Sequence, residues 1–179
     1  VPAWRRLLAL GLLLLVSQAW AGALSPLTWP ADSAGHLAMD GRYAVLVDGT
    51  RALNVDAVLA GRHDAEFIAA TRRDTNFGFT HAEVWLRFVI RYTSANSAPP
   101  VLVLPRPLID DVDVYAVDAS GRGSHVATGD NHPFSTRPIA YRGFAFLLDV
   151  KAGETVTYYL RARSETGAIS LPIELMDSA

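Results

Sequence analysis

Residues 83–92, EVWLRFVIRY, contain the clearest structural pattern in the chain. Their side chains alternate between an apolar side and a mixed side, with Leu86, Phe88 and Ile90 on the first and Trp85, Arg87 and Arg91 on the second. Because successive side chains of an extended strand point to opposite faces, this alternation predicts a β-strand with one face in the core. The second face places an indole ring between guanidinium groups, so it is the first candidate for a functional surface.

Short segments with the same alternation, or with an unbroken apolar run, recur on both sides of residues 83–92. They are residues 43–47, 101–104, 110–117, 125–128, 144–150, 155–164 and 169–175. Turn-forming residues separate them, and the only helical expectation after residue 21 is one turn within 56–61. The chain is therefore expected to be all-β. Because hairpins alternate with long arms, we favour a jelly-roll β-sandwich.

Two of these segments carry predictions about their place in a sheet. Residues 144–150 are nearly apolar on both faces, which predicts a central strand. Pro172, in the last segment, cannot donate to a hydrogen-bond ladder, which predicts an edge strand.

The N-terminus has the pattern of a secretory signal peptide. Arg5 and Arg6 precede an apolar run over residues 7–16, and Ala19 and Ala21 are small residues at the positions that a signal peptidase inspects. We predict a signal peptide over 1–21, a leader over 22–40 in which Trp29 docks on the domain, and a β-sandwich domain over 41–177. An uncleaved membrane anchor is the alternative, but the apolar run is shorter than the roughly 20 residues of a spanning helix.

Composition narrows the class of protein. The chain has 179 residues, of which 50% are hydrophobic and 19% charged, enough for one globular domain. Without residues 1–21 it keeps 14 basic and 18 acidic residues, a net charge of −4, which does not suggest nucleic acid as a partner. The chain has no cysteine although the signal implies an oxidising compartment, so a bacterial periplasm is the expected location.

Catalytic patterns are weak in this sequence. It lacks cysteine and a Gly-x-Ser-x-Gly elbow, and its histidines, each interpreted as an exposed loop residue, show no spacing typical of a metal site. Asp111 and Asp113 share a strand face, so glycoside hydrolysis is an alternative function. The competing interpretation is that these acids pair with arginines of neighbouring strands. We expect no enzyme activity, no metal and no cofactor.

A binding face is the stronger hypothesis. Trp85 and Arg87 project the same way from one predicted strand, and Tyr159 and Arg161 project the same way from another. If the two strands are neighbours, these side chains form a platform whose aromatic rings and guanidinium groups can hold a saccharide, most readily an anionic one. The alternative is that the arm over residues 131–142 covers Trp85 and that acids satisfy the arginines.

The order of several motifs is similar to that of a known family. These motifs are residues 85–88 (WLRF), 107–110 (PLID) with Val112 and Tyr115, 129–130 (GD), 133–134 (PF), 137–138 (RP) and 158–161 (YYLR) with Ser164. Over roughly residues 40–175 the chain resembles the 7TMR-DISMED2 family, the periplasmic domain of bacterial receptors with diverse intracellular signalling modules.

The resemblance implies a jelly-roll sandwich of the carbohydrate-binding type that senses a ligand for a membrane receptor. It carries over a ligand-binding set that we combine with Tyr159 of the platform: Trp85, Arg87, Asp130, Arg137, Tyr159 and Arg161. The expected partners are a small-molecule ligand, namely a carbohydrate, and the transmembrane region of the receptor if the chain is part of a longer protein. Family members usually continue into seven membrane helices and an output domain, so we expect either an excised piece of a receptor or a free-standing periplasmic module. A protein-contact or homodimerisation module is the alternative from another class.

Overall fold

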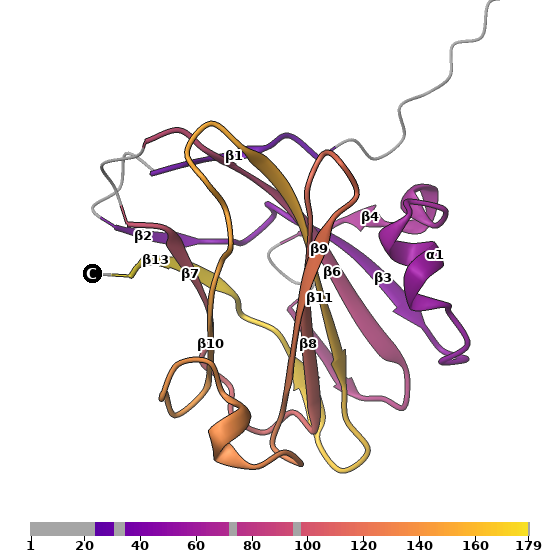
Figure 1. Ribbon diagram of the computed structural model, residues 1–179. Coiled ribbons are helices and arrows are strands. Elements are labelled where there is room, and N and C mark those ends of the chain that lie inside the picture. Colours follow the sequence, from indigo (N-terminus) through magenta and orange to yellow (C-terminus); the bar gives the residue numbers. More distant parts are fainter. Residues whose placement is uncertain (1–23, 31–34, 72–74, 95–97, 179) are drawn as a thin grey trace, which may run out of the picture.

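The structure, a computed structural model, describes residues 24–30, 35–71, 75–94 and 98–178. Two main β-sheets face each other across the core (Figure 1). The larger sheet has the strand order β4 (Ile68–Ala69), β3 (Ala44–Asp48), β6 (Glu83–Tyr92), β11 (Thr155–Arg163), β8 (Asp111–Val117) and β9 (Gly123–Thr128), and β1 (Leu27–Trp29) pairs in parallel with β6. The expected all-β class is confirmed, and the predicted signal peptide over 1–21 lies outside the described residues.

The smaller sheet has the order β10 (Phe144–Leu147), β7 (Pro100–Leu104), β13 (Glu174–Asp177) and β2 (His36–Ala38). A two-stranded ribbon joins β5 (Asn76–Phe79) to β12 (Ala168–Ser170). Three short helices complete the described elements: α1 (Val55–Leu59), η2 (Asp64–Glu66) and η3 (Phe134–Thr136). No helix in these ranges has the length and apolar character needed to cross a membrane.

The core lies between the two sheets and contains the predicted apolar side of β6. Leu86, Phe88 and Ile90 are all fully buried. Phe88 stacks on Tyr158 of the neighbouring β11, with ring centroids 5.4 Å apart. The alternation of residues 83–92 therefore predicted the inward face correctly, because burial of one strand face is a local property of the pattern.

The stretch over 22–40 contributes to both sheets where it is described. β1 extends along β6 with Leu27 opposite Ile90, and β2 pairs with β13. Trp29 is fully buried in the core, so its predicted docking is confirmed.

Two predictions about strand position were wrong. β10 is an edge strand of the smaller sheet, and its second face is apolar because the arm residues Ile139 and Tyr141 pack beside Ala145. Pro172 lies in the break between β12 and β13, so it leaves the ladder of β13 intact, and β13 is an inner strand between β7 and β2.

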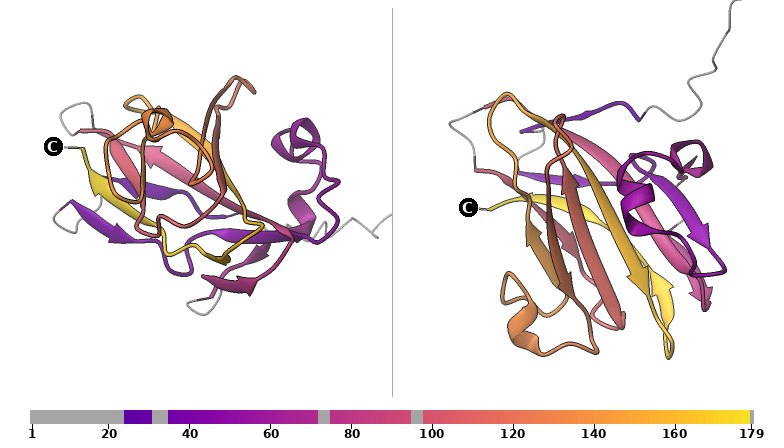
Figure 2. Two further views of the ribbon diagram at one scale, coloured as in Figure 1. Left: turned by 90° about the horizontal axis from the view of Figure 1, so that it is seen from below. Right: turned by 45° about the vertical axis from the view of Figure 1, so that its right-hand side comes forward.

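The helical turn expected within 56–61 is confirmed as α1. The Asn54 side chain caps it by accepting a hydrogen bond from the Ala57 N–H, 3.0 Å away. α1 lies outside the larger sheet, on the side away from the smaller one (Figure 2). Residues 53–67, which we call the α1 cover, pack Val58 and Phe67 onto that outer face.

Candidate functional site

The outer face of the larger sheet carries four of the six predicted ligand residues. β6 and β11 are direct neighbours, with Arg161 opposite Trp85 and Tyr159 opposite Arg87. The condition on which the predicted platform depended is thus met, and the four side chains share one face.

Trp85, however, is fully enclosed. Its exposed fraction is 0%, and it lies in a cluster with Leu46, Val58 and Tyr115, whose ring stacks on the indole at 6.1 Å. The expectation of an accessible indole was therefore wrong. The expectation that the arm over 131–142 would cover it was also wrong, because the contacts come from the α1 cover.

Arg87 is held by the same cover. Its guanidinium forms an ion pair with Asp64 and lies over the Phe67 ring, 4.9 Å from the centroid. Arg87 is 5% exposed, so its charge is balanced inside the protein. Tyr159 forms a hydrogen bond with Arg87, and burial, followed by the charge of Asp64, raises the pKa of Tyr159.

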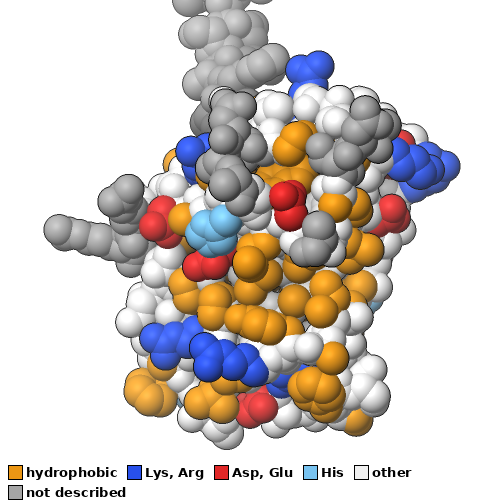
Figure 3. All heavy atoms as spheres, turned by 90° about the vertical axis from the view of Figure 1, so that its left-hand side faces the viewer, with side chains coloured by type: hydrophobic (Ala, Val, Ile, Leu, Met, Phe, Trp, Pro, Cys, Tyr) orange, Lys and Arg blue, Asp and Glu red, His pale blue; other side chains and the backbone are white. Residues whose placement is uncertain are grey.

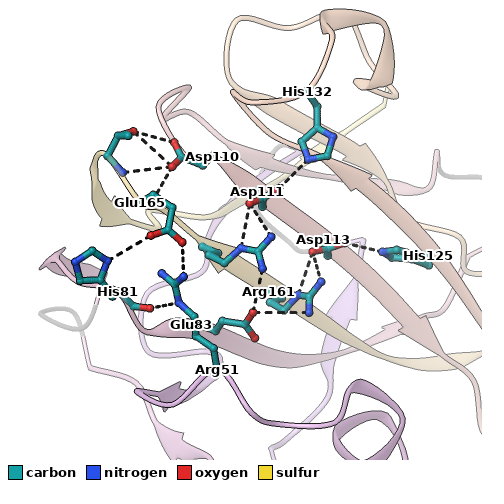
Figure 4. A network of polar contacts seen from close by, with 12 residues as sticks. Arg51, His81, Glu83, Asp110, Asp111, Asp113, His125, His132, Arg161 and Glu165 are labelled. Carbon is teal, nitrogen blue, oxygen red and sulfur yellow. Dashed lines mark hydrogen bonds and ion pairs between the residues drawn. The ribbon is translucent and has the colours of Figure 1, made fainter.

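A ladder of charges extends along the same face toward one end of the sheet (Figure 4). Arg161 donates two hydrogen bonds to Asp113, at 3.0 and 2.8 Å, and Arg163 donates two to Asp111, at 3.0 and 2.9 Å. Glu83, 4% exposed, lies 3.9 and 3.6 Å from the two guanidinium groups. We call these five residues the charge ladder. The interpretation that Asp111 and Asp113 pair with arginines of a neighbouring strand is confirmed.

Two histidines extend the ladder, and the sequence did not reveal them. His125 of β9 contacts Asp113 through Nε2 at 2.7 Å and stacks on Tyr115 at 4.3 Å, while His132 contacts Asp111 through Nε2 at 2.8 Å. The expectation that each histidine is an exposed loop residue is wrong for His125 and His36, which lie in β9 and β2, whereas His132 lies in a turn but is only partly exposed. The strand register, in which Tyr115 lies opposite His125, is the signal that reveals the first contact.

These contacts set the ionisation of the ladder. Burial tends to raise the pKa of Asp111, but hydrogen bonds from His132 and Arg163 outweigh it and lower the pKa below its ordinary value. Burial tends to lower the pKa of Arg161. The hydrogen bonds to Asp113 and the charge of Asp113 outweigh burial and raise the pKa of Arg161 above its ordinary value. The ladder is an internally paired network of acids and arginines.

The third acid of the predicted group has a separate role. Asp110 is 5% exposed and accepts hydrogen bonds from the backbone N–H groups of Glu165 and Thr166, at 2.6 and 3.3 Å. It thereby fixes the turn that follows β11.

A groove of about 370 Å³ lies beside Tyr159, between the α1 cover and the β8–β9 turn. We call it the Tyr159 groove; its remaining lining residues are Leu59, Ala60, Gly61, Asp64, Val117, Asp118, Ala119, Thr155 and Thr157. Neither threonine hydroxyl has a hydrogen-bond partner among the described residues. The groove therefore offers an aromatic surface, free hydroxyls and carboxylate acceptors, without a basic side chain in its lining.

Asp130 and Arg137 belong to the segment after β9. One guanidinium nitrogen of Arg137 donates to the carbonyls of Tyr141, Arg142 and Gly143 at 2.8–2.9 Å. The same guanidinium lies 4.9 and 4.8 Å from the ring centroids of Phe134 and Phe144, so its contacts shape the arm. Asp130 is exposed, and its backbone N–H donates to the Ile109 carbonyl at 2.8 Å. The structure does not bring these two residues to the platform, and their ligand role stays a prediction.

Metal ligation finds no support in the described ranges, where no group of three or more histidine or acidic side chains is placed to hold an ion. The charge ladder instead satisfies its acids with arginine and histidine.

Comparison with known proteins gives one match. Residues 40–177 match the family model described as 7TMR-DISM extracellular 2. No curated protein matches the chain.

Proposed function

The chain belongs to the 7TMR-DISM extracellular 2 family, 7TMR-DISMED2, and from this premise we propose that it is the periplasmic ligand-sensing domain of a bacterial transmembrane receptor. Membership supports a sensor domain outside the cytoplasm. The proposal adds a carbohydrate ligand, a jelly-roll sandwich of the carbohydrate-binding-module type, and no chemistry on the ligand.

The observation that carries the ligand class is the chemistry of the Tyr159 groove. A sugar presents C–H surfaces that pack on an aromatic ring and hydroxyls that exchange hydrogen bonds with threonine and carboxylate groups. The lining contains Asp64 and Asp118 and no basic residue. Asp64 and Asp118 already pair with Arg87 and Arg122, and no basic side chain lines the groove to bind an anionic group, so a neutral saccharide takes the place of the anionic one that the arginines suggested.

The other predicted ligand residues then act indirectly. Asp64 lines the groove and also holds Arg87 at the edge of the Trp85 cluster. A ligand that contacts Asp64 therefore changes the energy of the α1 cover. Binding affects a receptor only if the ligand has different affinities for its two states, and the α1 cover is the element through which we propose that difference arises.

Isothermal titration calorimetry with neutral oligosaccharides and uronic acids tests this assignment. Ala119→Trp places a large ring in the groove, whereas Ala152→Trp makes the same change in an exposed turn outside its lining. We expect a neutral saccharide to bind the parent and Ala152→Trp, and to lose at least about tenfold in affinity for Ala119→Trp. Binding of uronic acids alone, or equal binding by both variants, contradicts the groove assignment.

Glycoside hydrolysis is the alternative that the same panel addresses. A general acid of this reaction needs a raised pKa, whereas that of Asp111 is lowered, and Arg161 and His125 both bind Asp113. These contacts support binding without catalysis. Release of reducing ends from any member of the panel would replace the sensor proposal with a hydrolase.

A further inference from the structure

A second cavity, of about 270 Å³, lies where the β8–β9 turn meets the connection from β10 to β11. Figure 1 shows these two connections at the same end of the molecule. Ala116 and Val156 form the apolar part of the lining, and both are buried members of the core between the sheets. The cavity, which we call the Asp149 pocket, therefore lies on the inner side of the larger sheet, whereas the Tyr159 groove lies on its outer side. Its other lining residues are Asp118, Arg122, Gly123, Ser124, Asp149, Lys151 and Glu154.

Hydrogen-bonded turns hold both walls of the Asp149 pocket. On one wall, the carboxylate of Asp118 accepts hydrogen bonds from the backbone N–H groups of Ser120 and Arg122, at 2.8 and 3.0 Å. On the other wall, the carboxylate of Glu154 accepts a hydrogen bond from the backbone N–H of Lys151 at 3.0 Å. Side-chain to backbone bonds of this kind fix a turn locally, so the lining residues are positioned without a ligand.

Asp149 and Lys151 supply charges that the protein leaves free. Leu148 and Val150 are buried, and the two residues that alternate with them are exposed and line the pocket. In the part of the chain that the structure describes, neither the Asp149 carboxylate nor the Lys151 ammonium has a hydrogen-bond or ion-pair partner, and the two groups do not pair with each other. Tyr158 donates to Asp149 only at the backbone carbonyl, 3.0 Å away.

The other charged groups of the lining are already engaged. Arg122 pairs with Asp118 at 3.0 Å, and Glu154 holds its turn. A ligand in this pocket therefore meets one free anion and one free cation. The Tyr159 groove differs, because no basic residue lines it. The outer face of the smaller sheet differs again, since hydrophobic side chains gather at its centre (Figure 3).

The size of the pocket limits the ligand. A volume of 270 Å³ holds roughly nine water molecules at about 30 Å³ each, and ligand pockets commonly range over roughly 300–1,000 Å³. The pocket therefore suits a molecule much smaller than an oligosaccharide. A ligand with a single charge would leave either the carboxylate or the ammonium partly desolvated and without a partner, which is unfavourable.

We propose that the Asp149 pocket binds a free α-amino acid with a short apolar side chain. The ammonium group of the ligand pairs with Asp149, and its carboxylate pairs with Lys151, through charge-assisted hydrogen bonds. Its side chain packs on Ala116 and Val156. The proposal does not depend on the saccharide assigned to the Tyr159 groove.

Isothermal titration calorimetry with glycine, L-alanine, L-valine and L-leucine tests the ligand class. Each amino acid is compared with the amine and the carboxylic acid that share its side chain, which for L-alanine are ethylamine and propionate. We expect at least one amino acid to bind, and both of its one-charge analogues to bind at least about tenfold more weakly. Absence of binding by all four amino acids, or an analogue that binds as tightly as its amino acid, would overturn the proposal.

Two variants test the roles of the free charges. Asp149→Asn and Lys151→Gln should each weaken binding of the amino acid at least about tenfold. The matched controls, Asp40→Asn and Arg106→Gln, remove the same charges at exposed positions outside the lining and should leave the affinity unchanged. Thermal midpoints show whether each variant is folded. Equal affinities for the parent and all four variants would contradict the assigned contacts.

The position of the ligand can be tested separately, because Lys151 is the only lysine in the chain. Reductive methylation with carbon-13 formaldehyde labels this side chain and the amino terminus, and it keeps the positive charge. The NMR signal that is missing in Lys151→Arg belongs to Lys151. We expect that signal to shift as the amino acid is added, with the dissociation constant found by calorimetry. Binding that leaves this signal unshifted would place the amino acid elsewhere and overturn the proposal.

Discussion

The guanidinium of Arg161 lies over the indole of Trp85, with its central carbon 5.5 Å from the ring centroid. The two residues are directly opposite in the β6–β11 ladder, and Arg161 also donates to Asp113 on its other side. Trp85 is thus covered by the α1 cover above and a paired cation beside it. We therefore expect Trp85 to contribute to the stability of the fold.

Replacement of Trp85 should therefore destabilise the fold. Trp85→Ala removes a fully buried ring and is expected to lower the free energy of unfolding by about 3–5 kcal/mol. Urea unfolding followed by circular dichroism measures this loss. Trp85→Phe keeps an aromatic ring in the cluster, so its free energy of unfolding should fall by less than that of Trp85→Ala. A Trp85→Ala protein as stable as the parent would show that the ring is not part of the packed interior.

The Arg161–Asp113 pair should contribute more than a surface ion pair. Arg161→Met and Asp113→Asn should each cost about 2–3 kcal/mol, because each removes the main partner of a mostly buried charge and leaves only His125 beside Asp113, or Glu83 beside Arg161. The double variant should cost less than the sum, with a coupling energy of about 1–2 kcal/mol in a double-mutant cycle from urea unfolding. Arg122 and Asp118 form the control pair, since the Arg122 side chain is 82% exposed, and their coupling energy should be smaller than that of Arg161 and Asp113. Equal couplings in the two cycles would contradict this interpretation.

Acid should weaken the contribution of Asp111. Its pKa in the folded protein lies below the ordinary value of 3.8, so the folded state binds its proton less readily than the unfolded state does. The resulting stability is fully present above that ordinary value and is lost as the pH falls through the lower, folded-state pKa. Urea unfolding from pH 5 to 2.5 should show the parent losing its advantage over Asp111→Asn as the pH falls. A stability difference that does not change over this range would contradict the shift.

Asp64 should hold the α1 cover in place. Asp64→Ala leaves the 5%-exposed Arg87 without the partner that it contacts in η2, so residues 55–67 should open more often. Hydrogen–deuterium exchange followed by mass spectrometry should show at least about tenfold faster exchange in this segment. Asp56→Ala, at an exposed position in the first turn of α1, is the control. Equal exchange in the two variants would show that packing alone holds the cover.

The sequence predicted local features well and long-range coverage poorly. The alternation of Leu86, Phe88 and Ile90 identified an inward face because a strand repeats every two residues. The platform followed from the same rule, once for β6 and once for β11. The sequence did not predict which segment covers Trp85, because α1 has only five residues and its contacts with β6 depend on tertiary packing.

The histidine contacts were missed for a related reason. His125 of β9 contacts Asp113 of the adjacent β8 diagonally, because the residue directly opposite His125 is Tyr115. This contact depends on the register of the β8–β9 hairpin, which a turn sequence specifies only approximately. Arg137 was assigned to the ligand face from motif similarity alone. A motif conveys which residues occur and in what order, whereas the carbonyls of residues 141–143 determine what its guanidinium contacts.

The place of β11 has a consequence for how the protein is made. β11 lies between β6 and β8, although it follows both in the chain, so these two strands have no ladder between them until residues 155–163 have emerged. A chain shortened before that point would expose the long edges of β6 and β8 together with their apolar faces, the situation that favours aggregation. Residues 155–163 therefore complete the centre of the sheet, and a growing chain must be kept from premature association until they arrive.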